Sequence, residues 1–246
     1  MGRELSRRLD LTPTVIGTPQ PATSETWRTA LPAALPGLRE LQHHHHRIVE
    51  RGSIPIAALP RCAASLATLP TIAKHHPEAL VVWFDAHADL NTPDNTTTGY
   101  LGGLVLGAAI GLWDSGLGAG LNPDNVVLGG TRDLDAPEQA LVDGGTIKLA
   151  TGPALHTMLD QYVGDRPIYF HLDCDVLEPG TVPTDYQVPN GLTLEDLNAV
   201  ARRLSHNQIV GIEIAEFEAT ADSTDTTNYA QPLLEALAPI LESARP

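Results

Sequence analysis

Short apolar runs alternate with stretches of helical periodicity along most of this chain of 246 residues. The run at 80–84, with the sequence LVVWF, is apolar at every position, which is typical of a strand buried on both faces. Strands that alternate with helices predict βαβ units and a mostly parallel sheet flanked by helices. Neither a linker nor a repeat divides the sequence, so we expect a single α/β domain over residues 1–246.

The expected elements are short strands separated by longer helices. Strands are expected at 14–16, 54–59, 80–84, 126–128, 146–149, 167–172 and 209–214. Helices are expected at 29–50, 63–75, 102–113, 192–203 and 230–244, with Pro32 and Pro36 early in the first helix or before it. The polar segment 218–228 is expected to be a loop.

Charge and cysteine content exclude several classes of partner. The formal net charge is -15, which would repel nucleic acid and anionic membranes. No apolar run approaches the roughly 20 residues of a membrane span, and the N-terminus lacks a signal-peptide pattern. Two cysteines do not make a disulfide framework, so we expect a cytoplasmic protein.

Chemically active side chains follow the expected strands. Ligand sites of parallel sheets lie beyond the carboxyl ends of the strands, so we expect the chemistry there. The residues at these ends are Cys62, Asp85, His87, Asp89, Arg132, Asp133, Asp135, Asp173, Cys174, Asp175 and Glu216. Carboxylates that converge with little basic company repel one another, so a cation must neutralise them. Carboxylate and imidazole together suit a divalent transition metal such as manganese.

The spacing of these residues supports a shared site. Residues two apart in an extended chain point to the same face, so Asp85, His87 and Asp89 can converge. The same holds for Asp173 and Asp175, whereas Cys174 should point into packing. A lone Asp-x-Asp is more often a turn or a cap. Asp-x-His-x-Asp directly after a buried apolar run is a much stronger metal signal.

Four motifs resemble the arginase family, the ureohydrolases. They are DAHADLNTP at 85–93, DCDVLEP at 173–179, GLT at 191–193 and the segment 213–216. The resemblance implies the three-layer arginase-type α/β fold and a centre of two Mn²⁺ ions. It implies these metal ligands: Asp85 and Asp173 bridging both ions, Asp89 completing one, and His87 and Asp175 completing the other.

Two positions depart from the family pattern. The family usually carries Gly-Gly-Asp-His after its early strand, and that histidine is a metal ligand. Here Cys62 stands in its place, so we expect a thiolate ligand; the alternative is a small buried apolar residue. The second departure is Gly102, which occupies the place of a histidine that helps to move protons.

Further matches concern the substrate. The resemblance assigns Asn91 and Thr98 to the α-carboxylate of an amino acid, Asp135 to its α-ammonium group, and Glu216 to the guanidinium. It also makes Asp89 the carrier of a proton to the leaving nitrogen. Two alternatives stay open: Arg132 and Asp133 could form a structural ion pair, and Thr98 could be a cap.

The favoured function is hydrolysis of a small guanidino substrate, Nω-hydroxy-L-arginine, to hydroxyurea and ornithine. The cysteine and Gly102 together resemble the branch of the family that acts in D-cycloserine biosynthesis, an antibiotic pathway. One alternative is an ordinary arginase or other ureohydrolase that releases urea, and a second is a non-catalytic binding paralogue. The sequence leaves the oligomeric state open, a monomer included.

A histidine run at 43–46 admits two interpretations. It could bind a metal, or it could be the exposed polar end of a helix, and the second interpretation is favoured.

Overall fold

The centre of the molecule is a six-stranded parallel sheet. The protein is described here by a computed structural model that covers residues 1–18, 26–218 and 223–245. The strands are β1 (Ile56–Ala58), β2 (Leu80–Phe84), β3 (Val126–Gly129), β4 (Lys148–Ala150), β5 (Ile168–Asp173) and β6 (Ile209–Ala215). They lie in the order β1-β6-β5-β2-β3-β4, and each neighbouring pair is parallel. The expected parallel sheet is therefore confirmed.

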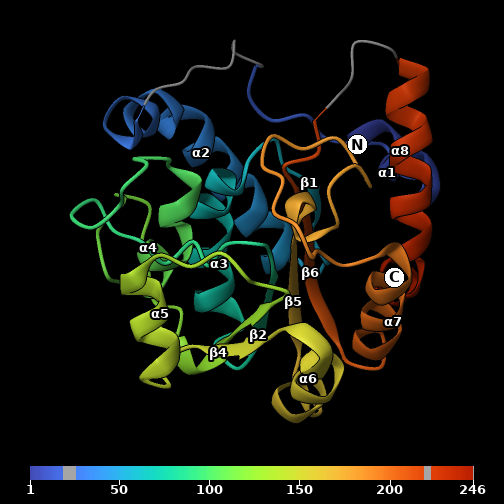
Figure 1. Ribbon diagram of the computed structural model, residues 1–246. Coiled ribbons are helices and arrows are strands. Elements are labelled where there is room, and N and C mark those ends of the chain that lie inside the picture. The colour runs from blue at the N-terminus through green and yellow to red at the C-terminus, as the bar shows by residue number, and fades with distance from the viewer. Residues whose placement is uncertain (19–25, 219–222, 246) are drawn as a thin grey trace.

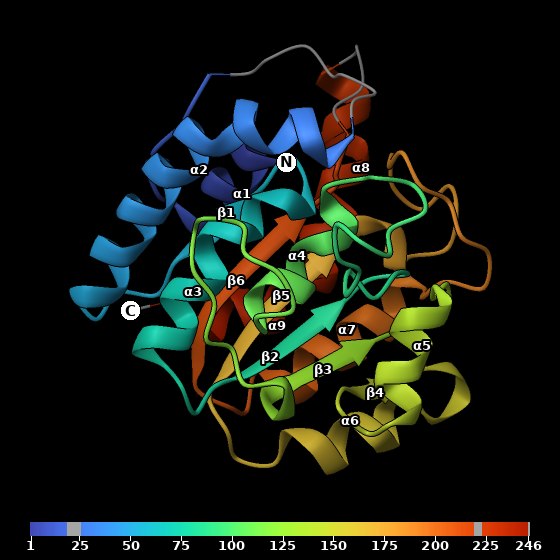
Figure 2. The same ribbon diagram turned by 90° about the vertical axis from the view of Figure 1, so that its left-hand side faces the viewer.

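Helices cover both faces of this sheet, as Figures 1 and 2 show. They are α1 (Gly2–Leu9), α2 (Trp27–Glu50), α3 (Ser65–His75), α4 (Val105–Ala109), α5 (Ala136–Asp143), α6 (Leu155–Val163), α7 (Leu194–Leu204), α8 (Ser223–Ala236) and α9 (Ala238–Ser243). In Figure 1, α2, α3 and α4 lie to the left of the sheet, and α7 and α8 lie to its right. Within the described ranges, no helix is long and apolar enough to cross a membrane.

Two apolar cores result from these layers. Successive residues of β2 alternate between them, because side chains along a strand point to opposite faces. Val82 and Phe84 pack with α6, α7, α8 and α9, whereas Val81 and Trp83 pack with α2, α3 and α4. Both cores are apolar, which explains why the sequence of β2 has no polar position.

Several expected elements differ in the structure. The expected strand at 14–16 is wrong, because this segment pairs with no strand and Val15 is 81% exposed. The helix expected at 102–113 is short: a 3-10 turn at Gly102–Leu104 precedes α4. Pro32 and Pro36 lie in the first half of α2, which is one of the two placements expected for them. Part of the expected loop at 218–228 is helical from Ser223 onward, and residues 219–222 lie outside the described residues.

The strand order places a crevice between β2 and β5. From β2 the chain continues outward through β3 to β4, whereas from β5 it continues the other way to β6. Loops that leave neighbouring strands in opposite directions open a crevice at their carboxyl ends. Phe84 is in register with Leu172, so the next residues, Asp85 and Asp173, face one another across this switch point.

Candidate functional site

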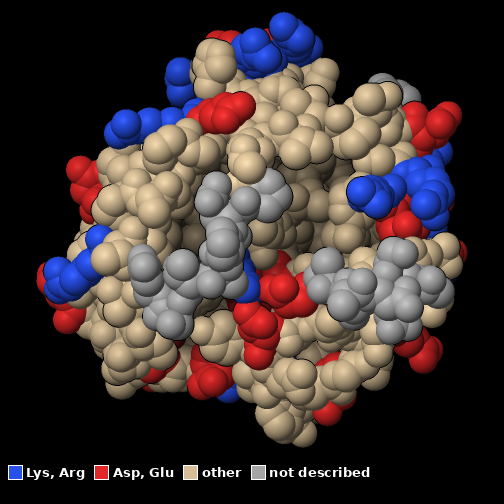
Figure 3. All heavy atoms as spheres, turned by 90° about the horizontal axis from the view of Figure 1, so that it is seen from above, with Lys and Arg blue, Asp and Glu red and all other residues tan. Residues whose placement is uncertain are grey.

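The predicted metal ligands converge at this switch point. Ligand atoms of Asp85, His87 and Asp175 lie within 4.8 Å of one another, and Cys62 forms similar groups with Asp85 and Asp89 and with Asp173 and Glu216. We call Cys62, Asp89 and Asp173 the Cys62 side, and His87 and Asp175 the His87 side; Asp85 joins groups on both. Figure 3, viewed from above, shows acidic side chains near the middle of the face toward which the strands run.

On the His87 side, an imidazole lies between carboxylates. Nδ1 of His87 is 3.0 Å from Oδ2 of Asp175 and 3.4 Å from Oδ1 of Asp85. Burial disfavours the charged imidazole, but hydrogen bonds to these carboxylates outweigh it and raise the pKa of His87 to about 12. The backbone N–H of Ala86 donates to Asp175 at 3.0 Å and fixes that carboxylate. The carboxylates of Asp85 and Asp175 therefore hold the imidazole of His87 in place and favour its charged form.

On the Cys62 side, a thiol lies among carboxylates. Sγ of Cys62 is 3.0 Å from Oδ2 of Asp173. Burial, and after it the charge of Asp85, raises the pKa of both Asp89 and Asp173. Burial, and after it the charge of Asp173, raises the pKa of the Cys62 thiol. Burial and like charge therefore favour the protonated forms of these groups, whereas a bound cation would favour their charged forms. Cys174, in contrast, packs in the apolar core of α7 to α9, as expected.

A divalent cation fits this arrangement. Among the described residues, Oδ2 of Asp89 is buried and accepts no hydrogen bond. A buried carboxylate oxygen without a partner is costly unless a cation supplies the missing interaction. The donor atoms are carboxylate oxygen, imidazole nitrogen and thiol sulfur, which suit a transition metal.

Two of the site residues have strained backbones. Asp89 has φ 54° and Glu216 has φ 58°, both in the left-handed region that non-glycine residues rarely occupy. The backbone carbonyl of Asp89 accepts a hydrogen bond from the N–H of Gly107 at 3.1 Å. A Cβ built on Gly107 would lie 2.5 Å from the backbone carbonyl oxygen of Asn91, so the two segments approach closely here. Strain of this kind persists where the surroundings enforce it, and it gathers at functional sites.

The sequence did not predict a role for His171, which contacts Cys62. Its Nε2 is 3.3 Å from the Cys62 sulfur, and its Nδ1 is 3.0 Å from Oε2 of Glu213. The ring stacks on Trp83 with centroids 3.5 Å apart. Burial disfavours a charged Glu213, but hydrogen bonding to His171 outweighs it and lowers the pKa of Glu213 to about 2. A polar residue inside the apolar run at 167–172 was the available signal.

Tyr100 fills the space that Gly102 leaves. A Cβ built on Gly102 would lie 2.4 Å from Cε1 of Tyr100, so this position is glycine because the tyrosine ring lies against it. The Tyr100 hydroxyl donates to Oε1 of Glu216 at 2.9 Å. The sequence left open what takes the place of the histidine, and in the structure the phenol of Tyr100 lies against Gly102.

Glu216 is buried and heavily hydrogen-bonded. Its Oε1 accepts the backbone N–H of Cys62 at 2.8 Å in addition to the Tyr100 hydroxyl. Its Oε2 accepts from the guanidinium of Arg61 at 2.8 Å. Arg61 also reaches Asp185 at 2.7 Å and Glu218 at 2.9 Å. In this structure the carboxylate of Glu216 is therefore paired with a guanidinium of the protein itself.

The residues predicted for the amino-acid end are only partly together. Nδ2 of Asn91 donates to Oδ2 of Asp135 at 2.8 Å. Thr98 is exposed, and its hydroxyl oxygen accepts the N–H of Tyr100 at 3.2 Å within a local turn; the helical turn that follows begins after Leu101, so Thr98 does not cap it. Arg132 donates to the backbone carbonyls of Gly130, Asp175, Val176, Val188 and Pro189. It therefore braces the loop after β5, and no ion pair with Asp133 occurs among the described residues.

Comparison with known proteins gives a consistent result. The sequence model of the arginase family matches residues 18–238. Over 243 residues the chain is 39% identical to an N(omega)-hydroxy-L-arginine amidinohydrolase of Streptomyces lavendulae, which covers 98% of this chain and 89% of that protein. It is 28% identical over 208 residues to an arginase of Bacillus caldovelox, which covers 78% of this chain and 69% of that protein.

A solved structure agrees with these sequence matches. The arginase of Bacillus cereus superimposes with a TM-score of 0.77 at 26% identity and covers 88% of this chain and 82% of its own. The three helix and sheet layers described above are therefore those of this solved structure.

Proposed function

The chain belongs to the arginase family, and from this premise we propose that it is a binuclear manganese hydrolase of linear amidines with Nω-hydroxy-L-arginine as its substrate. The observation that carries the proposal is the convergence of a thiol, an imidazole and buried carboxylates at one switch point. The similarity over nearly the whole chain to an N(omega)-hydroxy-L-arginine amidinohydrolase supports this choice of substrate.

We propose that the protein binds two manganese ions and that Asp85 and Asp173 would help to hold both of them. The ligands of the first ion would include Cys62 and Asp89, and those of the second would include His87 and Asp175. When bound, such ions lower the pKa of water and supply hydroxide near neutral pH.

The protein side chains then position the substrate and move protons. Glu216 orients the guanidino group by accepting its N–H hydrogens, as it accepts those of Arg61 in the structure. The guanidino carbon gains the oxygen of water, and its bond to the ornithine nitrogen breaks. The carboxyl group of Asp89 carries the proton to this leaving nitrogen, a general acid–base role. Ornithine and hydroxyurea together contain all atoms of the substrate and the water.

We propose that the amino-acid end of the substrate binds Asn91, Thr98 and Asp135. The first and last of these already meet through a hydrogen bond of 2.8 Å. Agmatine has no α-carboxylate to use these positions, so an amino acid is the favoured substrate.

Tyr100 supports the choice of a hydroxyguanidine. A phenol in the place of the proton-handling histidine is a poor acid and base here, because burial and the charge of Glu216 raise the pKa of Tyr100. A hydroxyguanidine is less basic than the guanidinium of arginine and depends less on such help. L-arginine is the alternative substrate, with urea as its product.

A paired assay tests the proposal. The purified protein with manganese is expected to turn over Nω-hydroxy-L-arginine with a kcat/KM well above that for L-arginine. Equal kcat/KM values would instead favour an ordinary arginase. Metal analysis separates both enzymes from a non-catalytic paralogue, because an enzyme of this class should hold about two manganese ions per chain.

We also propose that the protein is cytoplasmic and that residues 1–246 form a single domain. Both cysteines are free thiols, which is consistent with a reducing compartment.

A further inference from the structure

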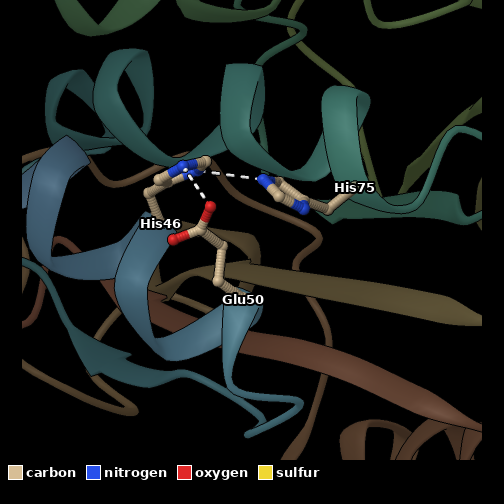
Figure 4. Close-up of side chains that lie close together, drawn as sticks. All are labelled: His46, Glu50 and His75. Carbon is tan, nitrogen blue, oxygen red and sulfur yellow. Dashed lines mark hydrogen bonds and ion pairs between the residues drawn. The ribbon is translucent and has the colours of Figure 1, made fainter.

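A second group of possible metal ligands lies where α2 packs on α3, away from the acidic centre. His46 and Glu50 project from α2, and His75 projects from the last turn of α3, as Figure 4 shows. The helix α3 is about 16 Å long, at 1.5 Å per residue, and Cys62 lies just before its other end. The two sites are thus at opposite ends of one helix.

We propose that His46, Glu50 and His75 form a separate binding site for one divalent transition-metal ion of the zinc class. Each residue offers one ligand atom, and these atoms lie within 4.8 Å of one another. Two imidazoles and one carboxylate are the donor set that zinc, nickel and copper prefer, whereas magnesium and calcium require oxygen.

The distances are near those of metal coordination. Nδ1 of His46 is 2.9 Å from Nε2 of His75. Two nitrogens that each lie about 2.0–2.1 Å from a tetrahedral ion are about 3.3–3.4 Å apart, so the two rings would separate slightly when the ion binds. His46 and Glu50 are four residues apart on one helix face, and Oε1 of Glu50 is 3.0 Å from Nε2 of His46. An ion would replace the proton between the two imidazoles, and Glu50 would leave Nε2 of His46 to reach that ion.

The neighbouring histidine shows that the members of the run at 43–46 differ in burial. His45 is buried, its ring lies edge-on to Tyr169, and burial lowers its pKa to about 4. His46, in contrast, is only half-buried and faces a histidine of another helix. The sequence interpretation favoured an exposed polar end of a helix for the whole run, and the buried His45 does not fit that interpretation.

The site is accessible and can be neutral. His43 and His46 line an open surface hollow together with Gln42, Lys74 and Leu117, so an ion can enter from solvent. Partial desolvation and the imidazole of His46 lower the pKa of His75, which favours the neutral form that binds metal. Three protein ligands leave a coordination position for water or for His43, one turn earlier on α2.

Metal counting on the full-length protein tests this site. Protein loaded with manganese is equilibrated with a slight excess of Zn²⁺, and bound zinc is measured by mass spectrometry of the metals. The wild type is expected to hold one zinc ion more than His75→Gln and His46→Gln. The variant Glu50→Gln should weaken this binding at least about tenfold. Zinc that enters the acidic centre cancels in the comparison, because each variant keeps that centre.

The exposed His206 provides a matched control. His206→Gln should bind as much zinc as the wild type, and zinc should raise the Tm of both proteins but not of His75→Gln. Equal zinc content in the wild type and His75→Gln would overturn the proposal, as would an equal loss in His206→Gln. Manganese-supported turnover should be the same in all of these variants, so this test is independent of the proposed hydrolase activity.

Discussion

The two sides of the acidic centre differ in how far they depart from the family pattern. On the His87 side, His87 and Asp175 are the residue types that the arginase resemblance implies, and they contact one another directly at 3.0 Å. On the Cys62 side, a thiol stands where a histidine is usual, and the unexpected neighbours gather there as well. They are His171 at the sulfur, Tyr100 beside Gly102, and Arg61 on Glu216.

This difference teaches where specialisation can occur. The strand ends after β2 and β5 supply both sides, so the fold holds the carboxylates in common. The Cys62 side additionally receives residues from the loop after β1 and from Tyr100, and these are free to change without moving the sheet. We therefore expect metal retention to depend on both sides, and substrate choice to depend on the Cys62 side.

The largest expected effect comes from Asp89. Asp89→Asn keeps a residue that tolerates the left-handed backbone but removes the proton carrier and the charge. We expect kcat for Nω-hydroxy-L-arginine to fall about 10²–10⁴-fold. Steady-state kinetics with saturating manganese measures it. A kcat within about threefold of wild type would remove Asp89 from the mechanism.

Exchange of one ligand on each side tests whether the sides are separate metal positions. Cys62→Ala and His87→Ala should each reduce manganese from about two ions per chain to about one, because each removes a ligand of a different ion. Metal analysis after gel filtration provides the measurement. Cys174→Ala is the matched control and should keep both ions, since that thiol lies in the apolar core. Full manganese content in Cys62→Ala would make the thiol a packing residue.

His171 tests whether the group behind the thiol matters. His171→Phe retains a ring to stack on Trp83 but loses the contacts with Cys62 and Glu213. Residues that orient metal ligands typically contribute about 10–100-fold in metal affinity, so one of two manganese-binding steps should weaken by that factor. Calorimetric titration resolves the two steps. The double variant His171→Phe with Glu213→Gln removes the carboxylate charge that would otherwise be buried without His171 as its partner. Unchanged manganese affinity in the single and the double variant would count against a role for His171.

Tyr100 and Gly102 test the crowding on this side. Gly102→His alone is expected to perturb the pocket rather than to restore arginine hydrolysis, because its Cβ would meet the Tyr100 ring at 2.4 Å. The double variant Tyr100→Ala with Gly102→His provides the room. Tyr100→Phe should raise KM about fivefold, the value of one hydrogen bond of about 1 kcal/mol. Arginine turnover in Gly102→His alone would show that the tyrosine moves aside readily.

The smallest expected effect concerns Arg61. Its guanidinium occupies an oxygen of Glu216 that the substrate requires, so Arg61→Gln should lower KM by at most about fivefold, given the partial exposure of this ion pair. The kcat should change little. A rise in KM would show instead that Arg61 holds Glu216 in its working position.

Much of the fold follows from local patterns, whereas the contacts that specialise the site do not. The buried run of β2 and the alternation with helices predict a parallel sheet, and spacing predicts that Asp85 and His87 converge. Val15 shows the limit, because an apolar triplet makes a strand only where a neighbour pairs with it. His171 lies 109 residues from the thiol it contacts, and Tyr100 lies 116 residues from Glu216. Pairs so distant are set by strand order, which periodicity does not encode.

The pairing of β1 with β6 has a consequence for folding during synthesis on the ribosome. Ile56 is in register with Ile212, and the N–H of Cys62 binds Glu216, so the Cys62 side needs residues that follow the first and the last strand of the described chain. A ribosome that adds about 5–20 residues per second needs roughly 8–30 seconds to make the roughly 150 residues between these strands. During that time Cys62 has been synthesised but Glu216 has not. The finished acidic centre therefore marks a chain that has been synthesised beyond Glu216, and chains truncated before β6 should fail to assemble it.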